Sequence, residues 1–251
     1  MLNEPTNEKL RALKLTGMAD AWVEQQRSAE AQRLSFDERL GILVDAECLL
    51  RQNKRLARAL KAAKLKIPHA CIEDIDYAPK REIDKAVIRQ LATCRWIDEH
   101  LNVLVSGATG TGKSYIGCAL AQLACRRGYR ATYRRASRLY NELELARGDG
   151  TYADLLERFA RFDVLVIDDF ALSSIGDDER RDLNEVLEDR CGSRSTVVTS
   201  QLPPGKWHEY LVDPTLADAI CDRVIPNSHR IVLKGPSRRP RPKATEANDK
   251  P

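Results

Sequence analysis

Apolar residues recur at three-to-four spacing through the first quarter of the chain. Two such series follow each other, and a capping-box pattern at Ser35 and Glu38 precedes the second. No proline lies between Pro5 and Pro68, so nothing interrupts this periodicity. The pattern predicts two or three helices over residues 1–66. The two series are Leu10, Leu13, Met18 and Trp22, and then Phe36, Leu40, Leu43, Val44 and Leu50.

Beyond residue 100 the pattern changes to short apolar runs that alternate with amphipathic segments. Because these runs are continuously apolar and rich in β-branched residues, they are typical of a parallel sheet covered by helices on both faces. We therefore expect an α/β fold with three layers, helix, sheet and helix. The predicted strands are residues 101–106, 131–135, 163–168, 195–200 and 230–233.

Two further changes of pattern set the expected domain limits. Pro68 and Pro79, with an acidic cluster, interrupt the helical periodicity, and a bridging helix is predicted over 82–98. After Leu233 the chain becomes basic and contains several prolines, with nothing to bury. We expect a small helical domain that binds DNA or a partner at 1–66, a linker with the bridging helix at 67–98, the α/β domain at 99–235 and a disordered tail at 236–251.

Composition changes this picture little. The chain has 251 residues and a formal net charge of +4, so only local clustering can indicate a polyanionic partner. No stretch approaches the roughly 20 apolar residues of a membrane span, and the first residues lack a signal pattern, so we expect a cytoplasmic protein. Seven scattered cysteines without a C-x-x-C pair are expected to be reduced thiols of the core.

The first predicted strand is followed directly by a complete phosphate-loop motif, G-x-x-x-x-G-K-[ST], and then by an amphipathic helix. Its glycines let backbone N–H groups surround phosphates, and the helix N-terminus adds a positive dipole end. Lys113 is expected to reach the β and γ phosphates, and the Ser114 hydroxyl to bind Mg²⁺, so ATP and Mg²⁺ are the expected cofactors. The expected nucleotide-binding residues are Gly107, Ala108, Thr109, Gly110, Thr111, Gly112, Lys113, Ser114 and Tyr115.

Acidic and polar residues end two other predicted strands. Asp168 and Asp169 end the run DVLVIDD; the first is expected to hold Mg²⁺ and the second to act as the general base that polarises the attacking water. The strand at 195–200 leads into Thr199, Ser200 and Gln201, one of which can present a polar group to the γ phosphate. The residues alone leave the choice between Ser200 and Gln201 open.

Basic residues gather in two places that could contact DNA phosphates. Residues 51–66 hold seven basic residues and no acidic one, and five of them fall at helical spacing on one face. Arg134 and Arg135, followed by Arg138, form a second cluster at a strand-to-helix junction. A solvated surface is the alternative for both and the simpler interpretation for the second. The five residues of the first cluster are Arg51, Lys54, Arg55, Arg58 and Lys61.

Long stretches of the chain resemble one family. LRALKLTGMADAW near the start, VLVIDDFALSSIGDDERRDLNEVLEDR and STVVTSQLPPGKWHEYLVDPTLADAICDRVIPNSHRIVLKG resemble the IstB-like helper ATPases of insertion sequences, which belong to the AAA+ class and are related to the DnaC and DnaA replication ATPases. The chain departs from the family pattern where Ala171 replaces a glycine, where Ser114-Tyr115 replaces Thr-His, and at Pro236 and Arg238 in the final motif. The first two departures leave the phosphate chemistry intact.

The resemblance implies a function. Such proteins are expected to assemble on double-stranded DNA with ATP as homo-oligomeric rings or spirals and to engage a transposase, cutting no DNA themselves. It also implies roles for Gln201 as a sensor, for Arg223 as an arginine finger acting on a neighbouring subunit, and for Arg239 as a second sensor that contacts nucleotide. Spacing alone favours an ion pair with Asp218 or Asp222 for Arg223, and solvation for Arg239. A replicative helicase loader with the same core is the alternative function.

Overall fold

The computed structural model describes residues 4–238 of the chain. The chain divides into two compact units, Met1–Ala59 and Leu60–Pro251, and the boundary falls inside helix α3 (Phe36–Ala63). Compactness does not assign roles, so the expected functional limits at residues 66, 98 and 235 stay predictions. From Arg239 onward the expected tail lies outside the described residues.

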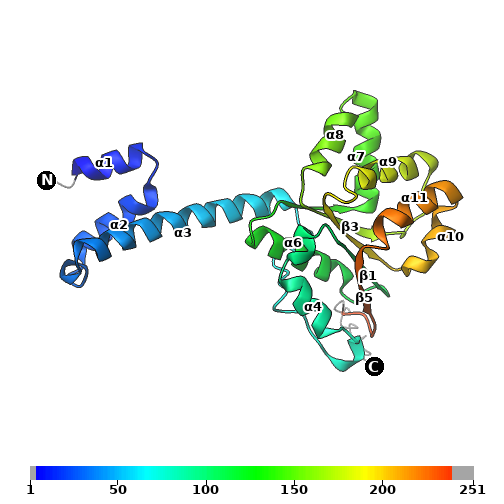
Figure 1. The fold of residues 1–251 in the computed structure, drawn as a ribbon, viewed down its shortest axis with the longest axis horizontal. Coiled ribbons are helices and arrows are strands. Elements are labelled where there is room, and N and C mark those ends of the chain that lie inside the picture. Colours follow the sequence, from blue (N-terminus) through cyan, green and yellow to red (C-terminus); the bar gives the residue numbers. More distant parts are fainter. Residues whose placement is uncertain (1–3, 239–251) are drawn as a thin grey trace, which may run out of the picture. The chain divides into compact units, whose positions relative to one another are not determined.

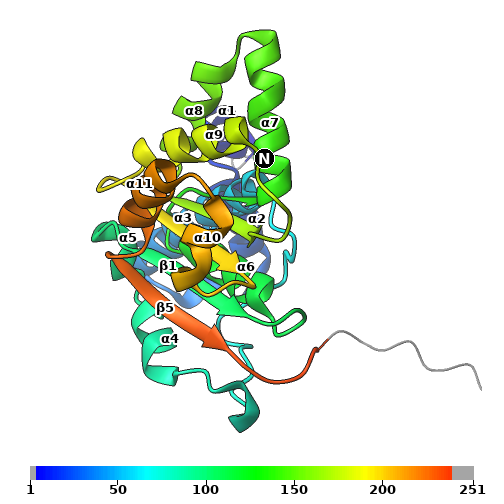
Figure 2. The same cartoon turned by 90° about the vertical axis from the view of Figure 1, so that its right-hand side faces the viewer.

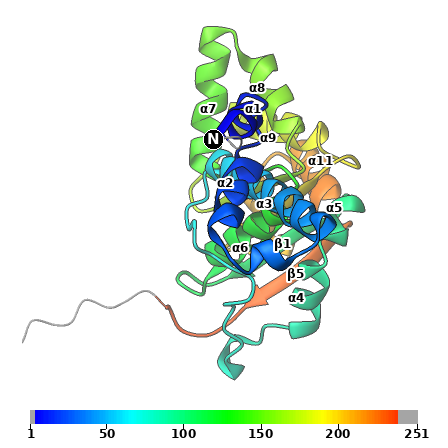
Figure 3. The same cartoon turned by 90° about the vertical axis from the view of Figure 1, so that its left-hand side faces the viewer.

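The first unit is helical, as predicted (Figure 3). It contains α1 (Glu4–Ala12), α2 (Thr16–Arg27), a 3-10 turn η1 (Ala31–Arg33) and most of α3. Helix α2 approaches α3 closely at Gly17, where a Cβ would lie 2.7 Å from the Ala46 carbonyl oxygen. The buried Glu47 carboxylate accepts the Gly17 N–H at 2.7 Å and closes this contact.

Helix α3 begins at the predicted capping box and runs without a break. The Ser35 N–H donates to the Glu38 carboxylate at 2.8 Å, and the Glu38 N–H donates to the Ser35 hydroxyl at 3.3 Å. The predicted apolar series on this helix is only partly buried. Leu43 is buried, but Phe36 and Val44 are exposed, so the periodicity found the helix without identifying its packed side.

The second unit is an α/β domain built on a five-stranded parallel sheet (Figure 1). The strand order is β2-β3-β4-β1-β5, so β4 lies between the strands that end in the phosphate loop and in Asp168. The strands are β1 (Asn102–Gly107), β2 (Ala131–Arg135), β3 (Val164–Phe170), β4 (Ser195–Ser200) and β5 (Ser228–Leu233). The helices are α4 (Lys85–Ala92), α5 (Arg95–Asp98), α6 (Lys113–Arg126), α7 (Ala136–Asp149), α8 (Tyr152–Ala160), α9 (Asp177–Glu188), α10 (Trp207–Leu211) and α11 (Pro214–Val224), with 3-10 turns η2 (Pro79–Arg81) and η3 (Pro204–Lys206).

Helices cover both faces of this sheet, which confirms the three-layer expectation (Figure 2). Helix α6 packs on one face, where Gly117 lets it come so close that a Cβ would lie 3.2 Å from both Val166 Cγ1 and Thr199 Cγ2. Leu165 and Val198, which alternate with those residues along β3 and β4, belong to the apolar core on the opposite face with α7 to α11. The predicted bridging helix 82–98 is instead two helices, because Cys94 adopts a left-handed conformation (φ 64°) between them.

The cysteines are all free thiols. Cys94, Cys118, Cys125 and Cys221 are buried as expected, whereas Cys48 and Cys191 are exposed, so the prediction of core thiols is wrong for these two. In residues 4–238 no helix has both the length and the apolar character that crossing a membrane requires.

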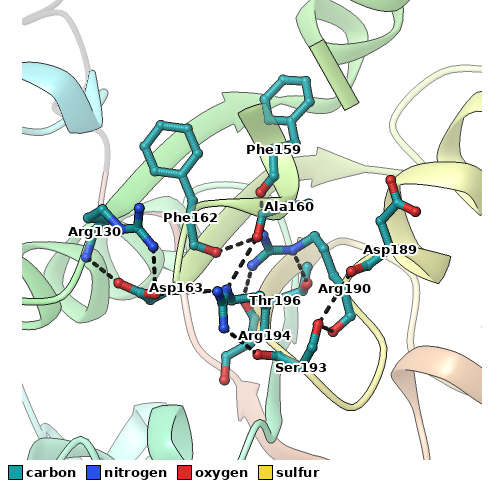
Figure 4. Close-up of polar contacts among 11 residues, drawn as sticks. Arg130, Phe159, Ala160, Phe162, Asp163, Asp189, Arg190, Ser193, Arg194 and Thr196 are labelled. Atoms are coloured by element: carbon teal, nitrogen blue, oxygen red, sulfur yellow. Dashed lines mark hydrogen bonds and ion pairs between the residues drawn. The ribbon is translucent and has the colours of Figure 1, made fainter. Parts of the chain in front are cut away.

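A buried arginine holds three elements of the second unit together (Figure 4). The Arg190 guanidinium, after the end of α9, donates to the carbonyl oxygens of Phe159 and Ser195 at 2.6 Å each and to that of Phe162 at 2.9 Å. Its Nε donates to the Thr196 hydroxyl at 3.2 Å. Burial away from water lowers the pKa of Arg190 below its ordinary value. The planar fork of a guanidinium allows one side chain to satisfy the end of α8 and the start of β4 together.

Candidate nucleotide-binding site

The loop between β1 and α6 has the conformation that only its glycines allow. Gly112 has a φ of 100° at the N-terminus of α6, and a Cβ there would lie 2.9 Å from the Arg81 guanidinium. That guanidinium donates to the Thr111 carbonyl oxygen at 2.7 Å and so braces the loop from outside. The arrangement leaves the first N–H groups of α6 directed into the loop, as an anion site requires.

Lys113 lies inside this loop and is buried. Its ammonium group donates to the carbonyl oxygens of Gly107 at 2.8 Å and Ala108 at 2.9 Å. The loop therefore places one positive charge among backbone amides at the point where the sequence predicts phosphates.

Asp168 is fully buried and receives four donors. The Thr199 and Tyr133 hydroxyls donate to it at 2.5 Å each, the Ser114 hydroxyl at 2.9 Å and the Lys66 ammonium at 3.2 Å. Burial raises the pKa of Asp168, but the hydrogen bonds from Thr199, Tyr133 and Ser114 and the charge of Lys66 outweigh it, so the pKa lies below its ordinary value. Burial and the bond to Asp168 raise the pKa of Tyr133 far above its ordinary value, so this phenol stays a donor.

Asp169 departs from the regular hydrogen-bonding pattern between β3 and β4. The β3–β4 register shifts between Ile167 and Phe170, and Asp169 itself has a φ of 58°. Its N–H donates to the Thr199 hydroxyl at 3.1 Å, and its carboxylate lies 3.1 Å from Arg135 Nε. The left-handed residue therefore points the second carboxylate of the pair into the cleft rather than along the strand.

Ala171 also has a left-handed backbone, with a φ of 59°. An L-residue with a Cβ is strained there by about 1 kcal/mol, and glycine is not. We expect Ala171→Gly to raise the free energy of unfolding by about 0.5–1 kcal/mol; the greater conformational entropy of glycine in the unfolded chain reduces this gain. Urea unfolding measures the change. The control is Ala62→Gly in α3, which should lower the free energy of unfolding, and a similar decrease for Ala171→Gly would show that Ala171 is not strained.

The three polar residues at the tip of β4 have different surroundings. Thr199 binds Asp168, and the Ser200 hydroxyl donates to the Phe170 carbonyl oxygen at 2.9 Å. Only Gln201 of the three lines the cleft beside the phosphate loop. This placement favours Gln201 over Ser200 as the group that faces a γ phosphate.

A cleft of about 730 Å³ opens at the carboxyl ends of the strands and collects the predicted site residues. It also contains residues that the motifs did not predict. Arg238 lines it, donates its N–H to the Gly110 carbonyl oxygen at 2.9 Å and pairs with Asp76 at 2.9 Å. Among the lining residues are Lys66, His69, Thr109, Gly112, Lys113, Ser114, Tyr115, Arg135, Asp169, Gln201 and Arg238.

The residues fit a Mg²⁺ ion of the kind held with substrate phosphates. Ser114 Oγ and Asp168 Oδ2 lie 2.9 Å apart, and the ammonium of Lys66 is already seated against both. This pair of hard oxygen donors thus attracts a cation, and Mg²⁺ characteristically takes one or two protein oxygens together with phosphates and water.

Arg223 lies at the amino ends of the strands, opposite the phosphate loop. Its backbone carbonyl accepts from Asn102, the first residue of β1, whereas the phosphate loop begins at the last residue of β1, about 17 Å away at strand geometry. Its guanidinium binds the carboxylate of Glu188 and the Ala219 carbonyl oxygen, and neither of the aspartates that the spacing suggested. It therefore cannot serve the nucleotide site of its own chain. Arg239 lies outside the described residues, and Arg238 is the arginine seen in the cleft.

The structure exposes the first predicted basic cluster but not all of the second. All five side chains of the first belong to exposed residues along α3, which we call the basic face: Arg51, Lys54, Arg55, Arg58 and Lys61. The second cluster is divided. Arg134 is buried, where it binds Glu142 and the Thr132 hydroxyl, so its prediction as a DNA contact is wrong in this conformation. Arg135 pairs with Asp169 in the cleft instead of extending a separate surface.

The fold and the phosphate loop together define a P-loop protein with a three-layer α/β fold. Within that class the chain belongs to the family of IstB-like ATP binding proteins, whose sequence model matches residues 8–246. The resemblance seen in the sequence is confirmed.

Relatives of known sequence cover nearly the whole chain. The candidate insertion sequence ATP-binding protein y4pL of Sinorhizobium fredii is 45% identical over 239 residues, 95% of this chain and 97% of that protein. The candidate ATP-binding protein of insertion sequence IS1162 of Pseudomonas fluorescens is 46% identical over 81% of this chain and 88% of that protein.

Solved structures share the fold at low identity. DnaI superposes with a TM-score of 0.57 and 19% identity, over 71% of this chain and 94% of that chain. The DnaC helicase loader gives 0.53 and 18%, over 66% and 97%. AMPPCP-bound DnaA from Aquifex aeolicus gives 0.52 and 17%, over 67% and 51%.

Proposed function

We propose that this protein is an ATP-dependent helper of transposition, which assembles on double-stranded DNA, recruits or stimulates a transposase and uses ATP hydrolysis as its switch. The observation that carries the nucleotide part is the meeting of two motifs 54 residues apart, with Ser114 Oγ donating to Asp168 at 2.9 Å beside the Lys113 loop. The names of the relatives, which place them in insertion sequences, support the biological part.

The residues of the cleft divide the work of hydrolysis. The loop amides and Lys113 hold the β and γ phosphates, and Ser114 with Asp168 holds Mg²⁺, which supplies positive charge to the phosphate oxygens. Asp169 accepts the proton of the attacking water as the general base, and Gln201 orients that water or the γ phosphate. Tyr133 and Thr199 keep Asp168 ionised and fixed.

Completion of the site requires a second subunit. Arg223 lies near the amino end of β1, and the cleft follows the carboxyl ends of the strands, so the guanidinium can reach only the cleft of a neighbour. An arginine supplied in this way stabilises charge on the transferred phosphoryl group and makes hydrolysis depend on assembly. A homo-oligomer, ring or spiral, follows from this role.

The basic face of α3 is the proposed contact with DNA. Lysine and arginine bind phosphates without reading sequence, and each contact releases counterions, so affinity falls steeply with salt. Duplex binding across a salt series, with ATP, ADP and no nucleotide, and with the size of the complexes measured in the same samples, tests the proposal. Large assemblies on DNA that require ATP support it. Nucleotide binding without DNA-dependent assembly would favour a helicase loader whose target is a protein.

Neutralising the basic face should change the salt dependence. We expect the combined variant Arg51→Gln, Lys54→Gln, Arg55→Gln and Arg58→Gln to reduce the slope of log affinity against log salt by about 3 to 4, because up to four phosphate contacts are lost. Fluorescence anisotropy with a labelled duplex gives the slope. The matched control removes the same charge from exposed residues of the same unit, Lys9, Lys14, Arg27 and Arg33. Equal slopes in the two variants would leave the basic face as a solvated surface.

A further inference from the structure

A lysine outside every motif occupies the cation position of the cleft. Lys66 follows α3 by three residues and belongs to the second unit, as does the cleft. Its Nζ lies 3.2 Å from Asp168 Oδ2, 3.4 Å from Ser114 Oγ and 3.7 Å from Asp169 Oδ2. These oxygens are the ones assigned to Mg²⁺ and to the general base. The ammonium group therefore takes the place that a divalent ion needs.

The segment that carries Lys66 is anchored on both sides. Ala63 and Leu65 before it are buried, and so is Ala70 after it. These neighbours fix the backbone from which the half-exposed Lys66 side chain reaches Asp168. Packing of this segment therefore positions Lys66 near Asp168, and the opposite charges add to that placement. An exposed surface lysine has no such packing to hold it near a carboxylate.

Lysine and Mg²⁺ cannot share these oxygens. Mg²⁺ binds oxygen at about 2.0–2.1 Å and needs near-octahedral geometry, so an ammonium about 3 Å from the same atoms would lie within about 5 Å of the ion. At that distance a single and a double positive charge repel strongly in a partly buried site.

We propose that Lys66 is a built-in competitor of Mg²⁺, which neutralises Asp168 while Arg135 pairs with Asp169, and withdraws when MgATP binds. This inference rests on the proposed binding of MgATP. Space for the withdrawal exists in the same unit, because Lys66 also lines a second cleft of about 450 Å³. Glu142 also lines that cleft but already pairs with Arg134 at 2.9 Å, so the displaced ammonium would be stabilised there by solvent.

A Mg²⁺ titration separates a competitor from a phosphate ligand. The probe is a fluorescent, non-hydrolysable ATP analogue at fixed concentration, and the readout is the Mg²⁺ concentration that gives half of the Mg²⁺-dependent binding. We expect Lys66→Met to lower this concentration about tenfold, because the ion no longer displaces a positive charge. Lys66→Arg should stay near the wild type. Lys64→Met, an exposed neighbour with the same change of charge, should match the wild type.

Other outcomes overturn the proposal. An unchanged Mg²⁺ requirement in Lys66→Met would make Lys66 a bystander, and a higher one, with weaker analogue binding, would make it a ligand of the phosphates. Failure of the wild-type protein to bind the analogue at any Mg²⁺ concentration would instead refute the proposed function.

A second measurement uses the wild-type protein, so it does not depend on the folding of any variant. The rate at which an amine-reactive reagent modifies Lys66, followed by peptide mass spectrometry, reports how freely the amine is available. Adding the Mg²⁺ complex of the analogue should raise this rate for Lys66 relative to Lys64. A fall in the rate of Lys66 would show that the amine becomes more enclosed and would contradict withdrawal.

Discussion

Lys113→Ala is expected to lower the affinity for MgATP by about 100-fold, which corresponds to the loss of a strong charge-assisted contact of up to about 3 kcal/mol. Lys113 is the positive charge inside the loop, where its ammonium is held by Gly107 and Ala108. The backbone amides of the loop remain in the variant, so weak binding should persist. Titration with the fluorescent ATP analogue at saturating Mg²⁺ measures the change.

The control for this variant is Lys206→Ala, which removes an exposed lysine of η3. Circular dichroism and thermal unfolding should show that both variants fold. Binding of the analogue by Lys113→Ala with wild-type affinity would refute the phosphate-loop assignment, and with it the roles of Ser114 and Asp168.

Arg190→Ala is expected to lower the free energy of unfolding by about 3–5 kcal/mol, because it removes three hydrogen bonds to backbone carbonyl oxygens and adds a cavity. These oxygens belong to Phe159, Phe162 and Ser195. In a domain of this size the loss corresponds to a fall in Tm of about 10 °C. Denaturant unfolding of the full chain, followed by circular dichroism, gives the change.

Two further variants separate the fork geometry of Arg190 from its charge. Arg190→Lys keeps the charge but cannot reach all of these oxygens, so most of the loss should remain. Arg194→Ala removes the neighbouring arginine, which is only half-buried, and should cost less than about 1 kcal/mol. Equal losses in Arg190→Ala and Arg194→Ala would contradict the role given to the buried guanidinium.

Much of the fold could be predicted because the sheet is buried on both faces. Its strands are continuous apolar runs with no competing interpretation, and the strands at 131–135 and 195–200 were predicted to the residue. The phosphate loop and Asp168 belong to motifs of fixed spacing beside those strands. Such a motif works through its own backbone conformation, so it can be recognised without knowledge of the tertiary structure.

Residues brought to the cleft by tertiary packing could not be predicted in this way. Lys66 lies 102 residues before Asp168 in the chain, and Arg238 follows the last strand; neither belongs to a motif. Arg134 failed for the opposite reason, because a basic residue in a strand looks exposed until Glu142 and Phe159 are found around it. The left-handed turn at Cys94 gave no signal, since glycine is the usual residue there.

The close approach of α6 to the sheet at Gly117 links the phosphate site to an apolar contact. Gly117 lies three residues, just under one helical turn, after Ser114, and a Cβ there would lie 3.2 Å from Val166 and Thr199. A larger side chain would require these neighbours or the helix to shift by a few tenths of an ångström, and Thr199 is a donor to Asp168. We therefore expect the spacing of Ser114 and Asp168 to depend on this contact, so position 117 should tolerate substitution less than many residues that line the cleft.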